Sequence, residues 1–179
     1  ISSFRASDGN TVRVEYRESL PSAAGLAKEF ANSGYPDRYV VFTERQTAVS
    51  AIGEALSENE SETGLYVSCI LRPSIFPSQA GSIGPISAVA FAAALEEHTS
   101  KKMGIGWVSD IYCDGVRIGC TSVEGKLDNF TSYEYLIVNF SVKLDKKNFP
   151  PRLTDMVRQV FEEDSLSVPM IMAKTVLNK

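Results

Sequence analysis

Apolar and polar residues alternate near the amino end of the chain, over residues 11–16. In an extended chain this alternation places Val12, Val14 and Tyr16 on one side, because successive side chains point to opposite faces. The pattern predicts a half-buried strand. Three more runs, rich in apolar and β-branched residues, predict further strands at 39–43, 65–71 and 133–144.

Helical spacing of apolar residues appears twice in the first hundred residues. Pro21 suits the first turn of a helix, with Ser19 or Leu20 before it, and the Asn-Ser-Gly run at 32–34 ends that helix. A second helix is expected from about residue 83 to His98, packed on a sheet. The side expected to face the sheet carries Ile83, Ile86, Val89, Ala90, Ala93 and Ala94. Two more helical patterns follow, at 152–162 and 168–177.

A hairpin is expected in the middle of the chain. Asp114-Gly115 separates the strand-like runs 105–113 and 116–123, and Asp-Gly tolerates the positive φ angles that tight hairpin turns need. The elements together predict an α+β domain, with a mixed, largely antiparallel sheet and helices on one side. The segment 45–63, rich in glutamate and without regular apolar spacing, is expected to be a long mobile loop.

Composition narrows the class of protein. A chain of 179 residues with 44% apolar and 22% charged residues fits one globular domain. The net charge of −4 offers no broad attraction for nucleic acid. Three cysteines without CxxC spacing and a single histidine predict neither a metal site nor a disulfide framework, and free thiols favour the reducing cytoplasm. The longest apolar stretch, around 86–95, is too short and interrupted to predict a membrane span.

Common phosphate-binding and catalytic motifs do not occur, but one ordered set of motifs does. A Gln-Thr-Ala turn at 46–48 and a Leu-Tyr strand from Leu65 precede an alanine-rich helix, a Gly-Trp-Val-Ser-Asp run at 106–110 and the Asp-Gly hairpin. This order resembles the catalytic domain of biotin-protein ligases over about 12–161. The resemblance implies a fold related to class II aminoacyl-tRNA synthetases. We expect one catalytic-like domain over 1–179, because the resemblance covers most of the chain and what remains has no room for the family's carboxy-terminal barrel domain or for a DNA-binding domain.

The resemblance implies a two-step reaction, in which biotin and MgATP form biotinyl-AMP and a lysine of a biotin-carboxyl-carrier-type acceptor protein attacks it. It also implies roles for five residues. Gln46 matches a biotin-contacting glutamine, and Ser19 matches the first residue of a Ser-Thr-Asn turn in the ligand site. Trp107 matches a wall of the adenylate site, Asp110 matches the acidic residue near metal and nucleotide, and Arg117 stands where the family has a lysine that reaches biotin and phosphate. A homodimer is a further possibility.

Several positions depart from the family pattern. Residues 49–55 stand where the family has an arginine-rich phosphate loop, and they contain no cation but do contain Glu54. In the tryptophan motif, Gly106 replaces a lysine and Val108-Ser109 replaces Pro-Asn. Leu20-Pro21 replaces Thr-Asn, and 137–141 replaces a glycine-rich strand. Charge-assisted hydrogen bonds contribute about 1.5 to 3 kcal/mol each, so losing two weakens binding or rate by roughly two to four powers of ten. We therefore expect a weak or inactive pseudoenzyme, whose segment 45–63 does not become ordered with biotin and MgATP.

Two other functions stay open. A working ligase or acyltransferase could use Arg117 and Asp110 on a different carboxylate, and a non-catalytic interaction module could dimerise through a sheet edge. Each site residue also has an ordinary structural interpretation. Trp107 could pack on the sheet, Arg117 could be a solvated surface cation, Asp110 could be a strand-edge carboxylate, and Gln46 and Ser19 could be structural or surface residues.

Overall fold

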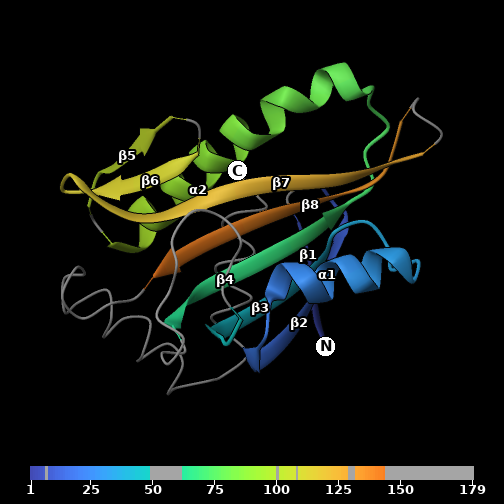
Figure 1. Cartoon of the computed structure of the whole chain (residues 1–179), viewed down its shortest axis with the longest axis horizontal. Helices are drawn as coiled ribbons and strands as arrows, with labels where there is room; N and C mark the ends of the chain where they lie inside the picture. Colours follow the sequence, from blue (N-terminus) through green and yellow to red (C-terminus); the bar gives the residue numbers. More distant parts are fainter. Residues whose placement is uncertain (7, 49–61, 100, 108, 129–131, 144–179) are drawn as a thin grey trace.

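The computed structural model describes residues 1–6, 8–48, 62–99, 101–107, 109–128 and 132–143. They form an eight-stranded sheet in the order β1-β2-β3-β4-β8-β7-β6-β5 (Figure 1). Only β2 and β3 pair in parallel, so the predicted mixed, largely antiparallel sheet is confirmed. The strands are β1 (Ser2–Arg5), β2 (Thr11–Leu20), β3 (Tyr39–Gln46), β4 (Glu62–Leu71), β5 (Met103–Gly106), β6 (Asp110–Cys113), β7 (Val116–Asp128) and β8 (Ser132–Lys143).

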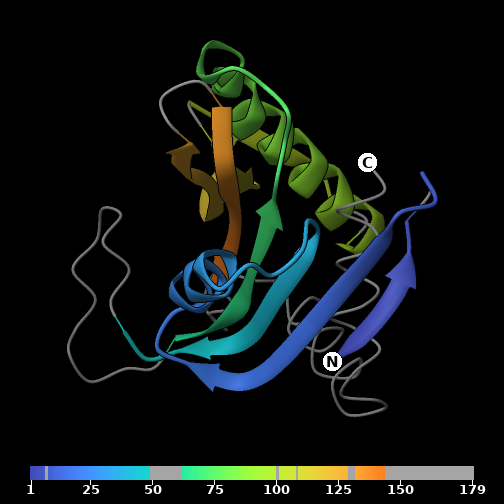
Figure 2. The ribbon, with the colours of Figure 1, turned by 90° about the vertical axis from the view of Figure 1, so that its right-hand side faces the viewer.

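The two described α-helices lie on opposite faces of the sheet, so the expectation that helices cover one side is wrong. Helix α1 (Ala23–Asn32) packs on Val41 and Ile70, whereas α2 (Ile83–Thr99) packs on Val40 and Phe42. Because neighbouring residues of a strand point to opposite faces, one strand supplies both cores. Figure 2 shows the sheet between the two helices.

Helix α1 begins later than the sequence predicted. The N-cap is Ser22, whose hydroxyl accepts a hydrogen bond from the Gly25 N–H at 3.1 Å, and Ser19 and Leu20 still belong to β2. At the other end, the Arg72 guanidinium donates to the carbonyl oxygens of Ala31, Tyr35 and Glu134. This arginine therefore ties the end of α1 and the following turn to strand β8.

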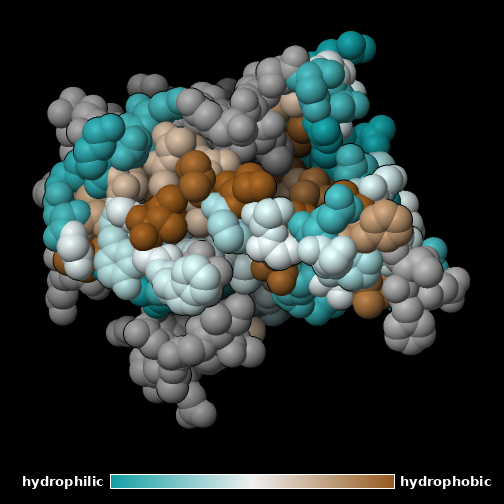
Figure 3. All heavy atoms as spheres, turned by 90° about the horizontal axis from the view of Figure 1, so that it is seen from above, coloured by the Kyte–Doolittle hydropathy of each residue, from teal (hydrophilic) through white to brown (hydrophobic). Residues whose placement is uncertain are grey.

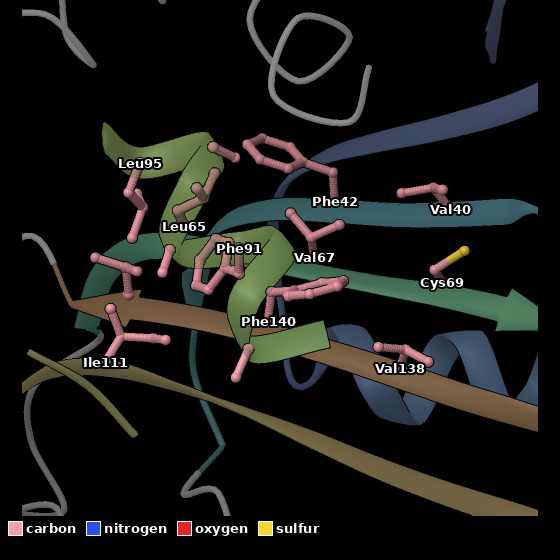
Figure 4. Close-up of a cluster of buried hydrophobic side chains, with 14 of the residues drawn as sticks. Val40, Phe42, Leu65, Val67, Cys69, Phe91, Leu95, Ile111, Val138 and Phe140 are labelled. Carbon is pink, nitrogen blue, oxygen red and sulfur yellow. The ribbon is translucent and has the colours of Figure 1, made fainter. Parts of the chain in front are cut away.

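Helix α2 forms the larger core, and its buried face matches the predicted one only in part: Ala94 is buried and Ile83 packs against the core. Figure 4 shows Phe91 and Leu95 pointing at side chains of β3, β4, β6 and β8, and the Phe91 and Phe140 rings lie 5.1 Å apart. Ile86 and Val89, expected inside, are 63% and 58% exposed. Much of the buried face consists of alanine residues. Because alanine is small and only weakly hydrophobic, the apolar spacing in the sequence did not identify this face as the buried one.

The outer side of α2 is apolar. Figure 3 shows hydrophobic residues gathered on the surface seen from above the molecule of Figure 1. The 3-10 helix η1 (Pro77–Ser82) continues into α2, and the joint segment Pro77–Glu97 is long and apolar enough to cross a membrane, by length and composition alone. The apolar segment is therefore longer than the stretch 86–95 that the sequence alone indicated. Core helices of soluble proteins pass the same test, and α2 packs on the sheet.

The hairpin turn is confirmed, and other boundaries differ. Asp114 and Gly115 have φ angles of 51° and 80°, as the predicted turn requires. The run 105–113 is not one strand, because the chain reverses between β5 and β6. Both ends of the predicted loop 45–63 are also strand, since Arg45 pairs with Thr63 and Gln46 with Glu62. Residues 49–61 and the helical patterns 152–162 and 168–177 lie outside the described residues.

Candidate functional site

A polar surface occupies the α1 side of β6, β7 and β8. Val138 and Phe140 point into the core under α2, so Asn139 and Ser141 point to the opposite face. The register then extends this surface across the neighbouring strands, because Cys120 pairs with Ser141, Ser122 with Asn139, and Asp110 with Cys120. We call this surface the polar platform; it consists of Asp110, Arg117, Cys120, Ser122, Asn139 and Ser141.

Asp110 and Arg117 form an ion pair on the platform. Arg117 Nε lies 2.9 Å from Asp110 Oδ1, and the two side chains are 39% and 29% exposed. An irregularity in the β6–β7 ladder sets Tyr112 opposite Arg117, which brings the arginine beside the start of β6. The structure thus places two of the five predicted site residues together. The pair is partly solvated, and Asp110 satisfies part of the hydrogen-bonding capacity of Arg117.

Ser19 and Gln46 lie at the ends of β2 and β3. The Gln46 Oε1 accepts a hydrogen bond from the Ala23 N–H at 2.8 Å, and the Ser19 side chain is exposed. Gln46 therefore holds the first turn of α1, a structural role that the sequence analysis left open. Strands β4 and β8 separate β3 from β7, a distance of roughly 14 Å at the usual strand spacing. Ser19 and Gln46 are thus on different strands from the Asp110–Arg117 pair.

Trp107 lies in the turn between β5 and β6 and is 92% exposed. The interpretation of Trp107 as a sheet-packing residue is therefore wrong. Gly106, which precedes it, has no space for a larger residue in this arrangement, because a Cβ there would lie 2.6 Å from the Tyr112 ring. The position that the family pattern gives to a lysine is thus overlaid by a tyrosine from β6.

Side-chain hydrogen bonds that no sequence motif predicted tie β7 to β8. Cys120 Sγ and Ser141 Oγ lie 3.3 Å apart, and Asn139 Nδ2 donates to Ser122 Oγ at 3.3 Å. Among the described residues, Asn139 Oδ1 is buried and has no hydrogen-bond partner. A visible signal was the recurrence of hydrogen-bonding residues at every second position of two neighbouring strands, Cys120 and Ser122 with Asn139 and Ser141.

Carboxylates accompany most of the described cations. Beside the platform, Lys28 of α1 lies 2.7 Å from Glu124 of β7, and the bond from Lys28 to Glu124 raises the pKa of this lysine. The other pairs are Arg17–Glu15, Arg38–Asp8, Lys101–Asp114, Lys102–Glu96 and Lys126–Glu134. No group of three or more His, Cys, Asp or Glu in the described part of the chain could hold a metal ion. The described residues therefore lack the concentrated positive charge that a triphosphate requires.

Known proteins are similar to this chain in sequence and in fold. No family model matches the chain. It is 27% identical over 143 residues to the bifunctional ligase/repressor BirA of Bacillus subtilis, which covers 79% of this chain and 44% of that protein. A biotin protein ligase variant from Aquifex aeolicus, solved with biotin, has a TM-score of 0.63 at 19% identity, over 92% of this chain and 66% of that one. A biotin protein ligase from Leishmania major, solved with biotinyl-5-AMP, has a TM-score of 0.62 at 18% identity, over 92% and 71%.

The fold is that of the catalytic domain of biotin-protein ligases, as the motif order implied. In sequence the chain is similar to biotin-protein ligases, at low identity. It spans less than half the length of the curated relatives that it matches.

Proposed function

We propose that this chain is a biotin-protein ligase-like domain with weak or no adenylating activity, which binds a carboxylate ligand on the polar platform. The observation that carries the proposal is the contact between Arg117 Nε and Asp110 Oδ1 at 2.9 Å. Arg117 is the one cation of the platform, and a carboxylate already neutralises it. A single ligand carboxylate can compete with Asp110, whereas a triphosphate needs several cationic groups.

The departures from the family motifs support weak adenylation. The segment that replaces the arginine-rich phosphate loop has no lysine or arginine and contains Glu54. The Gln46 amide oxygen is engaged with the Ala23 N–H. The residues described here thus do not fit MgATP, and we assign no reaction step to it. Similar proteins associate biotin and ATP with this fold, because three of the matched structures hold biotin and one of these also holds ATP. Mg is expected only from the resemblance.

We also propose that residues 1–179 act as one catalytic-like domain in the cytoplasm, and that its natural partner is an acceptor of the biotin-carboxyl-carrier type. The thiols of Cys69, Cys113 and Cys120 are free. Burial raises the pKa of the Cys69 thiol to about 12, which makes that cysteine an inert core residue. Free thiols support a reducing compartment.

Intact-mass analysis tests the proposal. The purified chain is incubated with biotin, MgATP and a biotin-acceptor domain, and a fully active biotin-protein ligase serves as the positive control. We expect no acceptor to gain the mass of one biotinyl group at a rate near that of the control. Labelling at a comparable rate would refute the proposal and favour a rebuilt active site.

An active ligase or acyltransferase with a rebuilt site is the first alternative function, because Asp110 and Arg117 lie together on one surface. If labelling occurred, Arg117→Ala and Asp110→Asn should both abolish it. A binding module is the second alternative, and the exposed Ile105 and Trp107 at edge strand β5 favour it. A homodimer through this edge would appear in analytical ultracentrifugation as a concentration-dependent increase in mass, which Trp107→Ala should reduce.

A further inference from the structure

We propose that a row of arginines on the outer strands of the sheet binds an extended acidic segment of a partner protein. The row consists of Arg5 on β1, Arg13 and Arg17 on β2, and Arg45 near the end of β3, and we call it the basic strip. Strand β4 and helix α1 separate it from the polar platform, so binding to the strip is independent of the proposed function. The motif resemblance gives no role to these four arginines.

Strand geometry places the four arginines on one face of the sheet. Val12 of β2 points into the core under α2, so Arg13 and Arg17 point to the α1 side. The register of β1 and β3 against β2 brings Arg5 and Arg45 to the same side. Helix α1 lies over β3, β4 and β8, and Figure 2 shows β1 and β2 beyond it, at the edge of the sheet. All four arginines are exposed.

Most of the positive charge on the strip is not compensated. The guanidinium groups of Arg5, Arg13 and Arg45 form no ion pair or hydrogen bond with the described residues, unlike most other described cations. Glu15 is the one carboxylate among the described side chains that β1 and β2 place on this face. Four arginines against one glutamate leave three positive charges, on a chain whose net charge is −4. An acidic ligand is therefore attracted to the strip more than to the rest of the surface.

The buried Glu15 holds Arg17 in position for a ligand. Glu15 is 6% exposed, and its Oε1 accepts hydrogen bonds from Nε and Nη2 of Arg17 at 3.0 and 2.5 Å. Its Oε2 accepts a hydrogen bond from the Tyr39 hydroxyl at 2.7 Å, which fixes the carboxylate. The Arg17 side chain is 57% exposed, and Glu15 does not engage its Nη1 group. A guanidinium held in this way loses less conformational entropy when a second carboxylate binds to it.

The spacing of the arginines favours a row of carboxylates over a single polyanionic group. Arg13 and Arg17 are four residues apart on β2, or roughly 13 Å at about 3.3 Å per residue. Charge spread over this length does not converge on one triphosphate. An extended peptide has the same repeat as a strand, so acidic side chains at alternate positions stay in register with the strip. Each arginine can then bind a carboxylate through two parallel N–H groups.

The neutral residues of the same face disfavour other anionic partners. Beside the arginines stand three exposed hydroxyl residues, Ser3, Thr11 and Ser19. Single-stranded nucleic acid binds through aromatic side chains that stack on its bases, and a membrane surface takes up apolar side chains beside the cationic ones. The described β1 and β2 residues on this face offer neither. Hydroxyl groups can donate to the carboxylates and carbonyls of an acidic peptide and accept from its N–H groups.

Fluorescence anisotropy with labelled peptides tests the proposal on the full chain. The probe alternates glutamate and serine and carries four glutamates, and the reference peptide has glutamine in place of each glutamate. At about 20 mM salt we expect the glutamate peptide to bind at least tenfold more tightly, because several exposed ion pairs act together. The preference should shrink at about 0.2 M salt, where the screening length is below about 10 Å. Equal affinities at low salt would overturn the proposal.

Matched charge reversals locate the binding surface. Arg13→Glu should remove most of the preference for the glutamate peptide, and its melting temperature should stay near that of the wild type because Arg13 makes no bond in the fold. Lys102→Glu makes the same change in net charge at a side chain that is 96% exposed between α2 and β5, and it should leave the preference intact. Equal weakening by the two variants would mean that the peptide responds to the net charge of the chain, which would overturn the role of the strip.

Two further measurements separate the strip from other sites and other ligands. In the wild type, the backbone amide resonances that the glutamate peptide shifts should centre on β1 and β2, a result that needs no variant to fold. Arg117→Ala should not weaken the peptide, so failure of the strip leaves the proposed function standing; weakening by Arg117→Ala would instead place the peptide on the polar platform and overturn the inference. Tighter binding of an oligothymidylate or of phosphatidylserine vesicles than of the glutamate peptide would overturn the choice of an acidic polypeptide.

Discussion

The side chain of Gln46 holds the first turn of helix α1, because its Oε1 accepts the Ala23 N–H at 2.8 Å. The first N–H groups of a helix have no partner within the helix, and a side-chain acceptor stabilises that end. The residue whose motif position implied contact with biotin thus fastens α1 to the end of β3. Any ligand that used the Gln46 amide oxygen would have to compete with the helix.

Gln46→Ala is expected to lower the free energy of unfolding by about 0.5 to 2 kcal/mol, the usual effect of losing a helix-capping acceptor. Gln46→Glu should be nearly neutral, because a carboxylate still accepts the N–H and its charge suits the amino end of a helix. Urea denaturation of the three proteins measures the difference. Equal stability of Gln46→Ala and the wild type would show that the bond to Ala23 contributes little.

Biotin with MgATP should stabilise the wild-type chain very little against heat. A ligand at 100 times its dissociation constant adds about 2.7 kcal/mol, which raises the melting temperature of a domain of this size by several degrees. We expect no such shift at micromolar biotin, because the platform offers one arginine already paired with Asp110. Differential scanning fluorimetry measures it, with an active biotin-protein ligase as the control. A shift of several degrees would mean that the retained residues suffice for tight binding.

Local sequence patterns predicted the strands well and the faces of the helices poorly. The strand at 11–16 and the Asp114-Gly115 turn followed from alternation and from backbone sterics, which act over a few residues. Helix α2 was predicted with Ile86 and Val89 inside, but the sheet buries Ala88 and Phe91 instead. Which stripe of an almost uniformly apolar helix faces the core depends on packing with distant strands, so periodicity alone could not decide it.

The candidate site was predictable only in part, for a similar reason. Asp110 and Arg117 lie seven residues apart across a recognisable hairpin, so their proximity could be expected from the sequence. The contacts of Asn139 with Ser122 and of Cys120 with Ser141 depend on the register of β7 against β8. A one-residue slip of β7 would turn Cys120 and Ser122 to the other face, away from Ser141 and Asn139, and no local motif fixes that register.

Trp107→Ala is expected to change the free energy of unfolding by less than about 0.5 kcal/mol, because the side chain is 92% exposed and buries little surface. Trp107 is the only tryptophan of the chain, so fluorescence reports on it directly. Strong quenching by acrylamide is expected in the wild type, and denaturant midpoints of the two proteins should coincide. A destabilisation of 2 kcal/mol or more would place the indole in a packed environment.

Stability should fall in acid partly through Glu15. This carboxyl is buried on β2; burial alone would raise its pKa, but hydrogen bonds from the Tyr39 hydroxyl at 2.7 Å and from Arg17 outweigh burial and lower it. A glutamate has a pKa of about 4.3 in an unfolded chain. Glu15 therefore stabilises the fold above that pH, and the contribution is lost as the pH falls through the lower pKa of the folded state.

Glu15→Gln should be less stable than the wild type by about 1.5 to 3 kcal/mol at pH 7, the range for hydrogen bonds to a charged group. The difference should shrink as the pH falls below about 4.3, where protonation removes the same charge from the wild type. Urea denaturation from pH 7 to pH 3 measures both slopes. Glu29→Gln, an exposed glutamate on α1, removes the same formal charge and should follow the wild-type slope. Parallel pH profiles for the wild type and Glu15→Gln would mean that the bonds from Tyr39 and Arg17 do not favour the ionised carboxylate.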